Sequence, residues 1–265
     1  MNASRPLVII GGGPAGMAAA IEAARAGLKA TLLDDSSALG GHVFRQPPRQ
    51  FHVGNAPELG HDFARGEKLR DEFSAAADRV EVLSNTSVLA VWPNNEILWA
   101  TDERSGVLRA ERMIIASGAY DRPMPFPGWT LPGVMSAGGI QTLLKTMRVR
   151  PGRRALIAGT GLLILAVARR LHEAGVEIAA ILDAGDAPWV KGRFLEKWRE
   201  WSVIKDAREH LECLKDAGVP ILSNHTVFEA HGPGEVRAAS FGAVHPTTWR
   251  PQKDRCQRVD VDLVA

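Results

Sequence analysis

The feature that most constrains this chain is a glycine-rich run close to its N-terminus, Gly11-Gly12-Gly13-Pro14-Ala15-Gly16. A continuous apolar run at residues 7–10 precedes it, which is typical of a strand buried on both faces of a parallel sheet. The segment MAAAIEAARAG follows it, which indicates a helix that ends at Gly27. A strand, a glycine turn and a helix in this order predict a nucleotide-binding α/β unit.

The spacing of these glycines predicts how the turn is used. Gly11 permits the tight turn, Gly13 lets the backbone approach a pyrophosphate, and Gly16 lets the helix pack closely on the strand. Pro14 and Ala15 would open the helix, where free backbone N–H groups point outward and favour phosphate.

An acidic residue stands at the distance that this motif requires. Asp34 ends the next predicted strand, KATLLD, and its carboxylate could accept both ribose hydroxyls of an adenosine. Asp35 is the neighbouring option. The alternative interpretation is an α/β turn that binds no nucleotide.

The same order of elements recurs in the second half of the chain. Residues 155–159 predict a buried strand, and a glycine turn, a helix and a strand ending at Asp183 follow. Gly159 and Gly161 match the first two glycines of the pattern, but Ile164 replaces the third. We expect this β-branched side chain to crowd the contact of the helix with the strand or with a nucleotide. A nucleotide site, an empty fold and a site for a different adenine nucleotide all stay open.

We interpret the two halves as an internal duplication, with a boundary near Pro151-Gly152 and a proline-rich connector at residues 121–133. The predicted fold is therefore α/β, with two Rossmann-like units in tandem. Residues 80–110 predict a small antiparallel meander in the first unit, and residues 112–116 a buried strand. Further helices are predicted at residues 65–77, 136–148 and 192–217.

The last of these helices carries an apolar stripe, which either packs on the neighbouring sheet or docks another protein chain. Residues 219–224 and 225–230 predict further strands, and residues 262–265 the beginning of a buried strand. We therefore expect the chain to stop within a domain. The stripe consists of Phe194, Trp198, Trp201, Ile204, Leu211 and Leu214.

Composition excludes several classes of function. The net charge is +2, with basic and acidic residues interspersed, so nothing favours nucleic-acid or membrane-surface binding. Two cysteines, Cys213 and Cys256, argue against a disulfide framework, a cysteine-rich metal or iron–sulfur site and a CxxC redox pair. The longest apolar run, residues 162–168, is too short to span a bilayer. With no signal peptide in the sequence, we expect a cytoplasmic protein.

No catalytic residue can be identified from spacing. His52 and His61 fit no metal motif, and no Ser–His–Asp arrangement is indicated, so we predict no metal site and leave the catalytic residues open.

The N-terminal segment VIIGGGPAGMAAAIEAARAGLKATLLDDSSALGG resembles FAD-dependent oxidoreductases with two dinucleotide-binding domains, the pyridine nucleotide-disulfide oxidoreductase superfamily. The resemblance implies that the first glycine motif holds the ADP half of FAD, with the Gly40-Gly41 pair near the same cofactor. A later stretch, Ala116-Ser117-Gly118, resembles the family's ATG motif with Ser117 in place of threonine. Arg45 either reaches the flavin or a phosphate, or is a solvated arginine. The residues implied for FAD are Gly11, Gly13, Pro14, Ala15, Gly16, Asp34, Gly41, Arg45, Ser117 and Gly118.

The resemblance also implies a role for each half. Residues 1–150 would be the FAD-binding domain, lacking the C-terminal return segment with a Gly-Asp pair that family members normally have. Residues 151–265 would be an incomplete NAD(P)-binding-like domain. Gly159, Gly161 and Asp183 would then hold NAD(P) or another adenine nucleotide.

The stretches GGHVFRQ and GAYDRPMPFPGWTLPGVMSAGGIQTLLK narrow the resemblance to one branch, the FAD subunits of heteromeric amine and amino-acid dehydrogenases. The FAD subunits of hydrogen cyanide synthase and of opine oxidase represent this branch. His42 stands where glutamine is expected, and no cysteine pair follows Gly40-Gly41, which argues against disulfide reductase chemistry.

The branch implies an FAD subunit that oxidises the C–N bond of an amine, amino acid or opine, or relays electrons from that oxidation. Its partner would be a second flavoprotein or an iron–sulfur subunit. One alternative is an NAD(P)H-dependent flavin reductase. Another is a truncated, non-catalytic nucleotide-binding or assembly subunit.

Overall fold

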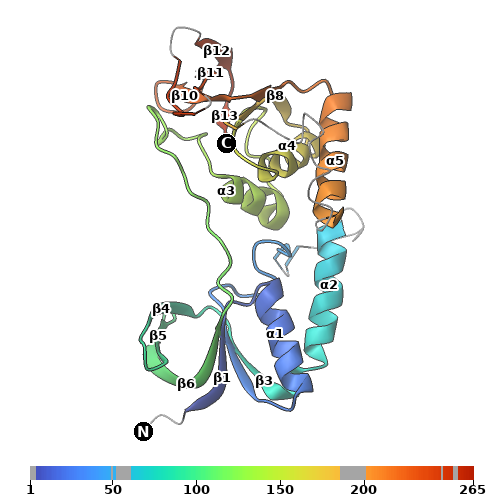
Figure 1. Cartoon of the computed structure of the whole chain (residues 1–265), viewed down its shortest axis with the longest axis vertical. Coiled ribbons are helices and arrows are strands. Elements are labelled where there is room, and N and C mark those ends of the chain that lie inside the picture. The colour runs from blue at the N-terminus through green and yellow to red at the C-terminus, as the bar shows by residue number, and fades with distance from the viewer. Residues whose placement is uncertain (1–3, 49, 52–60, 186–200, 246, 253–255) are drawn as a thin grey trace. The chain divides into compact units, whose positions relative to one another are not determined.

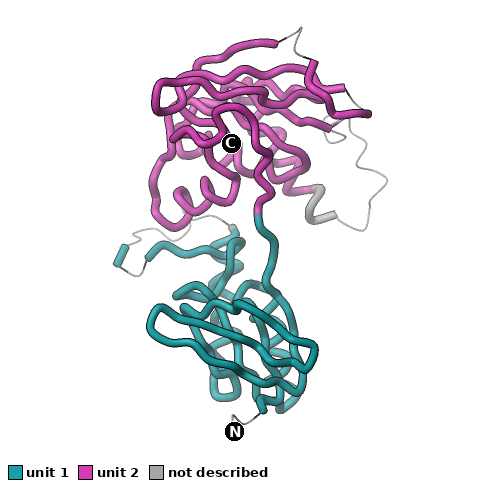
Figure 2. Tube along the Cα trace, turned by 90° about the vertical axis from the view of Figure 1, so that its left-hand side faces the viewer, with its two compact units in different colours: residues 1–120 teal, residues 121–265 magenta. Residues whose placement is uncertain are grey.

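The computed structural model describes residues 4–48, 50–51, 61–185, 201–245, 247–252 and 256–265. The chain divides into two compact units, residues 1–120 and residues 121–265, which have different colours in Figure 2. The sequence places the boundary near Pro151-Gly152 instead, so the structure assigns the intervening segment to the second unit.

Packing explains why the segment 121–150 belongs to the second unit. Val134 forms a parallel bridge with Val264, close to the other end of that unit in sequence. Ile140 is fully buried in the core that the second unit builds around its own sheet. These contacts join residues that are far apart in sequence, so the composition of the proline-rich connector does not predict them.

In the first unit, six strands form one sheet in the order β3-β2-β1-β6-β5-β4 (Figure 1). Strands β3, β2, β1 and β6 pair in parallel, and β6, β5 and β4 pair antiparallel. The elements are β1 (Arg5–Ile10), α1 (Pro14–Arg25), β2 (Ala30–Leu33), α2 (His61–Ser74), a 3₁₀ turn (Ala77–Arg79), β3 (Val80–Leu83), β4 (Ser87–Val91), β5 (Glu96–Ala100) and β6 (Ser105–Ile115).

The apolar run of β1 forms the centre of this unit. Because successive side chains of a strand point to opposite faces, Leu7 and Ile9 pack with α1, whereas Val8 and Ile10 pack with Ile97 of β5. Both faces of the strand are therefore covered, as its continuous hydrophobicity predicts.

Two local predictions in this unit need correction. β3 pairs in parallel with β2, so residues 80–83 extend the main sheet and are not part of an antiparallel meander. Residues 112–115 are not a separate strand, because they form the end of the long strand β6. The helix α1 ends as predicted: Gly27 has φ +78°, and its N–H donates to the carbonyl of Ala24.

The second unit contains a four-stranded parallel sheet in the order β13-β7-β8-β9 and a separate antiparallel sheet of β10, β11 and β12. Its helix α3 is shorter than predicted and continues as a π-helical turn at Leu143–Met147. The elements are α3 (Ala137–Thr142), β7 (Arg154–Gly159), α4 (Leu163–Glu173), β8 (Glu177–Asp183), α5 (Trp201–Asp216), β9 (Ile221–Ser223), β10 (His225–His231), β11 (Ala238–Ala243), β12 (Gln257–Asp260) and β13 (Leu263–Val264).

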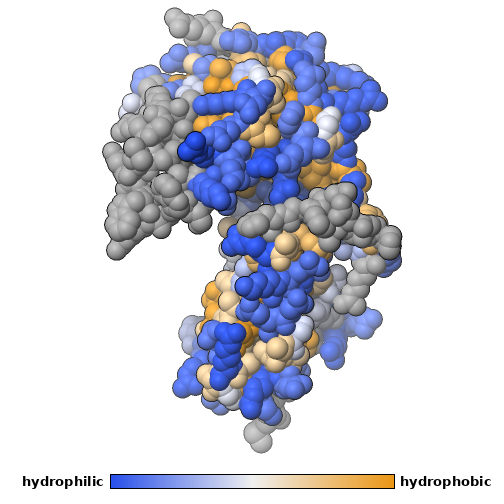
Figure 3. All heavy atoms as spheres, turned by 90° about the vertical axis from the view of Figure 1, so that its right-hand side faces the viewer, coloured by the Kyte–Doolittle hydropathy of each residue, from blue (hydrophilic) through white to orange (hydrophobic). Residues whose placement is uncertain are grey.

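In each unit four strands pair in parallel, and the two faces of these strands are covered by different elements. In the second unit, α3, α4 and α5 cover one face of the sheet, and the antiparallel sheet covers the other. In the first unit, α1 and α2 cover one face, and Ile97 of β5, from the antiparallel part of the same sheet, packs against the other. On the face drawn in Figure 3, hydrophilic and apolar side chains are interspersed.

The structure describes part of the predicted helix at residues 192–217, as α5. Leu211 is 8% exposed and Leu214 is fully buried against α4, so this part of the stripe packs inside the unit. Phe194 and Trp198 lie outside the described residues. In the part of the chain that the structure describes, no helix is long and apolar enough to cross a bilayer.

Candidate functional site

The first glycine turn joins β1 to α1, and its geometry excludes side chains at two positions. Gly11 has φ +104°, and a Cβ on it would overlap the carbonyl oxygen of Ala116, which follows β6. A Cβ on Gly16 would overlap the carbonyl oxygen of Gly11. Strand, turn and helix can therefore approach this closely only with glycine at both positions.

The N-terminus of α1 is open and uncapped. Gly13 is the N-cap with extended backbone, and no side chain accepts a hydrogen bond from the first turn. Pro14 has no N–H, so Ala15 and Gly16 provide the first free donors of the helix. A Cβ on Gly13 would meet only Gly41 Cα, at 3.8 Å. Free donors and open space suit an anionic group at this end of the helix.

Asp34 lies just after β2 and is held by two backbone groups. Its Oδ2 accepts the N–H of Gly12 at 2.5 Å, and its Oδ1 accepts the N–H of Ser36 at 2.9 Å. The residue is 7% exposed. Each carboxylate oxygen keeps a further lone pair, so the group can still accept two hydroxyl donors.

The Gly40-Gly41 pair packs directly on the first glycine turn. Gly40 N donates to the carbonyl of Gly12 at 2.9 Å. A Cβ on Gly41 would lie 2.8 Å from Gly13 Cα. The pair thus forms one wall of the space in front of the turn.

The residues after β6 reach the same place. The N–H of Ala116 donates to the carbonyl of Ile10 at 2.7 Å, which carries the chain past the turn. Ser117 and Gly118 are exposed there, and Gly118 has φ +73° with no atom within 4 Å of where a Cβ would lie. The first unit therefore brings together four segments that the sequence singles out separately.

Arg45 lies a few residues beyond the glycine pair. Its Nη2 is 3.3 Å from Nε2 of His42, and its Nε is buried without a hydrogen-bond partner among the described residues.

The second glycine turn joins β7 to α4 and differs in its packing. Gly161 has φ +88° with open space around it. Ile164 is buried, and a Cβ on Gly159 would lie 2.8 Å from its Cγ2. The side chain thus fills the space beside the strand end. The helix begins at Leu163, and no side chain caps it.

Asp183 ends β8 and is fully buried. Its Oδ1 accepts the N–H of Gly185 at 2.7 Å, whereas its Oδ2 has no hydrogen-bond partner among the described residues. Burial raises the pKa of this carboxyl, and the hydrogen bond from Gly185 opposes that shift in part. A buried oxygen without a partner fits a ligand hydroxyl.

The structure also forms a serine–histidine–glutamate contact that spacing does not predict. His231 Nε2 is 2.7 Å from Ser240 Oγ, and His231 Nδ1 is 3.4 Å from Glu229. Glu229 and Ser240 are directly opposite partners of β10 and β11, so strand register alone brings them together. We assign this contact no catalytic role.

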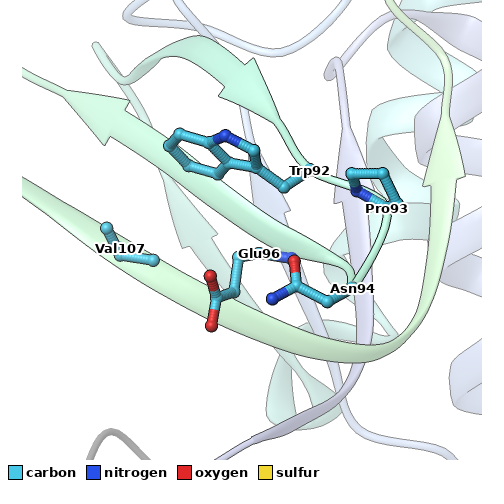
Figure 4. Close-up of a pocket in the computed structure, with 5 residues that line it drawn as sticks. All are labelled: Trp92, Pro93, Asn94, Glu96 and Val107. Atoms are coloured by element: carbon cyan, nitrogen blue, oxygen red, sulfur yellow. The ribbon is translucent and has the colours of Figure 1, made fainter.

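A surface hollow lies at the turn between β4 and β5 (Figure 4). Its lining is largely apolar, and Asn94 Oδ1 accepts the N–H of Glu96 within the turn itself. The hollow therefore follows from the hairpin, and we assign it no ligand. The described residues contain no cluster of side chains suited to a metal, and His52 lies outside them.

The sequence of the chain matches a family model over residues 5–264, described as pyridine nucleotide-disulphide oxidoreductase. The chain belongs to this family. The predicted family is therefore confirmed, and its members are FAD-dependent oxidoreductases with NAD(P)-binding domains.

Two relatives place the chain more closely within the family. It is 38% identical over 262 residues to the hydrogen cyanide synthase protein HcnB of Pseudomonas aeruginosa, covering 97% of this chain and 55% of HcnB. It is 34% identical over 195 residues to an opine oxidase subunit from Agrobacterium tumefaciens, covering 69% of this chain and 37% of that protein. The chain thus spans about half the length of HcnB and less of the opine oxidase protein.

Solved structures share the fold. L-proline dehydrogenase from P. horikoshii matches with a TM-score of 0.60 and 18% identity, over 99% of this chain and 41% of that one. The mixed α/β architecture of the family is therefore present here.

Proposed function

We propose that this chain is an FAD-binding oxidoreductase subunit. It would oxidise the C–N bond of an amine, amino acid or opine, or relay electrons from a partner protein that does so. The observation that carries this proposal is the 38% identity to HcnB, a subunit of hydrogen cyanide synthase, over 97% of the chain. The similarity to an opine oxidase supports the same bond type.

The first unit would hold FAD. Its pyrophosphate would lie at the N-terminus of α1, at Gly11, Gly13, Pro14, Ala15 and Gly16, where the donors are free and the space is open. Asp34 would accept the ribose hydroxyls, and Gly41, Arg45, Ser117 and Gly118 would line the same space. FAD supplies the two-electron acceptor, and the protein supplies binding, orientation and electrostatics.

The two units would be dinucleotide-binding units in tandem. They share the order of layers, a glycine turn after the first strand and an aspartate at the end of the next strand. We assign the FAD role to residues 1–120 and the NAD(P)-binding-like role to residues 121–265.

The decisive test is the visible absorption spectrum of the purified chain, with the cofactor identified after denaturation. We expect bound oxidised FAD. Asp34→Ala should weaken FAD binding at least about tenfold, because charge-assisted hydrogen bonds contribute about 1.5–3 kcal/mol. Asp35→Ala is the matched control, since Asp35 is the exposed neighbour. A colourless wild-type chain that takes up no added FAD would overturn the proposal, and an Asp34→Ala chain with unchanged affinity would overturn the ribose assignment.

A second candidate, an NAD(P)H-dependent flavin reductase, is favoured by Oδ2 of Asp183, which has no hydrogen-bond partner in the part of the chain that the structure describes. A ribose hydroxyl would satisfy this oxygen, whereas Ile164 occupies space close to the turn. Steady oxidation of NADH or NADPH by the FAD-loaded chain, lost in Asp183→Asn, would support this activity. No oxidation by the wild-type chain would exclude it.

The relatives are named as subunits, which supports a partner such as a second flavoprotein or an iron–sulfur subunit. Mixing the FAD-loaded chain with amines, amino acids and opines without oxygen distinguishes direct oxidation of the substrate from electron relay. Bleaching of the flavin band when only this chain is present would place the substrate site in this chain, and bleaching only with a partner present would indicate electron relay.

We also propose that the protein is cytoplasmic, because Cys213 and Cys256 are both unpaired.

A further inference from the structure

Three side chains of the first unit form a cluster beside the glycine pair, which we call the Arg45 cluster: Arg45, His42 and Tyr120. Arg45 Nη2 lies 3.3 Å from Nε2 and 3.5 Å from Nδ1 of His42. The rings of His42 and Tyr120 meet edge to face, with centroids 5.9 Å apart. Tyr120 is 84% exposed, so the cluster opens to the outside.

The backbone holds this cluster next to the glycine turn. Phe44 N donates to the carbonyl of Gly40 at 3.1 Å, and the Phe44 side chain is 7% exposed. These contacts fix the loop that carries His42 and Arg45. Tyr120 comes from the separate segment after β6, two residues beyond Gly118.

Hydrogen-bond donors outnumber acceptors in the Arg45 cluster. Arg45 has five N–H groups and accepts none, yet its described neighbour is a histidine and not a carboxylate. Its Nε is buried without a hydrogen-bond partner among the described residues, and an oxygen atom of a bound anion would supply the missing acceptor. His42 and Tyr120 each add an N–H or O–H donor. A planar guanidinium with such neighbours is suited to two oxygen atoms of one anion.

We propose that the Arg45 cluster is an oxyanion-binding site that acts together with the glycine turn. Two anions of the proposed function have this chemistry: the carboxylate of an amino-acid substrate and the pyrophosphate of FAD. Because both anions belong to the proposed function, the inference rests on that function. Arg45 would bind the anion with its Nε and one Nη, while its contact with His42 fixes the guanidinium plane.

The test compares Arg45→Gln with Arg112→Gln, which changes an exposed arginine on β6 of the same unit. FAD affinity is measured by titrating the apoprotein while following flavin fluorescence. Calorimetry then measures binding of tetrahydrofuran-2-carboxylate, which carries a carboxylate but no oxidisable C–N bond, and of inorganic pyrophosphate. The calorimetric measurements use the protein without FAD, so they test anion binding whether or not the chain binds FAD.

We expect Arg45→Gln to weaken the binding of one of these ligands at least about tenfold. Arg112→Gln should change no ligand affinity by more than about twofold. Loss of carboxylate binding alone identifies a substrate carboxylate as the anion. Loss of FAD and pyrophosphate binding identifies the cofactor. Arg45→Lys should recover part of the loss, because it keeps the charge but not the planar pair of donors. Equal affinities of Arg45→Gln and Arg112→Gln for all three ligands would overturn the inference.

Discussion

The two glycine turns of this chain start from the same order of elements and reach different geometries. In the first, Gly16 allows α1 to touch the backbone of Gly11. In the second, Ile164 stands at the matching position and packs into the core beside Gly159. The first turn therefore keeps open space in front of Gly13, whereas at the second turn the side chain of Ile164 fills the space beside Gly159.

The carboxylates that follow the two turns differ in the same sense. Asp34 is tied to its turn through Gly12, where a Cβ would lie 2.9 Å from Oδ2. Thr160 stands at the matching position of the second turn, and Asp183 keeps one oxygen without a partner among the described residues. A carboxylate held in place before a ligand arrives loses less entropy on binding. We therefore expect the first site to bind its nucleotide more tightly than the second.

The largest effect is expected from Gly16→Ala, which would remove the feature that distinguishes the first turn. The new Cβ would overlap the carbonyl oxygen of Gly11, a backbone atom that cannot move alone. We expect the free energy of unfolding of the first unit to fall by about 3 kcal/mol or more and its Tm to fall by about 10 °C or more. The variant should also lose FAD.

The control for this variant is Gly27→Ala. Gly27 has φ +78°, but a Cβ there meets no atom within 4 Å. Its cost should be about 1 kcal/mol and FAD should stay bound. Equal melting temperatures and flavin content in the two variants would show that the close approach at Gly16 is not required.

A smaller and more selective effect is expected from Gly13→Ala. The Cβ would have only Gly41 Cα nearby, at 3.8 Å, so the fold should tolerate it and Tm should change by less than about 3 °C. The same methyl group would enter the space proposed for the pyrophosphate, so FAD affinity should fall about tenfold or more. Thermal unfolding without flavin and fluorescence titration with FAD separate the two quantities. Unchanged FAD affinity would show that the phosphates do not lie at Gly13.

Much of the first candidate site could be predicted from sequence because its signals are local. The apolar run before Gly11, the glycine spacing and the position of Asp34 all lie within one strand–turn–helix–strand segment. The contact of Gly41 with Gly13 is different, since only the folded chain shows that one loop packs on the other.

The unit boundary was missed because the deciding contacts are distant in sequence. Prolines mark the segment after Asp121 as a connector, yet Asp121 Oδ2 accepts the N–H of Gly138 at 2.6 Å at the start of α3. A carboxylate at a helix N-terminus is favourable, and it ties the connector to the second unit. The pairing of β3 with β2 is likewise set by tertiary packing, because a short apolar strand is compatible with either sheet direction.

The smallest effect, and the sharpest contrast between the carboxylates, is expected from Asp183→Asn. Burial raises the pKa of Asp183 above the ordinary value of 3.8, so the folded chain holds this proton more tightly than the unfolded chain does. The ionised group therefore destabilises the fold progressively as pH rises from about 4 through the raised pKa. Asp183→Asn removes this penalty. At pH 8 we expect the second unit to gain about 1 kcal/mol, or about 2–4 °C in Tm, and the gain should shrink toward pH 4.

The exposed substitution Asp260→Asn on β12 serves as the matched control and should show no such pH-dependent gain. Asp34→Asn should behave in the opposite way at neutral pH. It removes a carboxylate that two backbone N–H groups already satisfy, so it should lower the stability of the first unit. If Asp183→Asn lowered stability at pH 8 as Asp34→Asn does, the second carboxylate would be as well satisfied as the first. The contrast between the two turns would then not extend to their acidic residues.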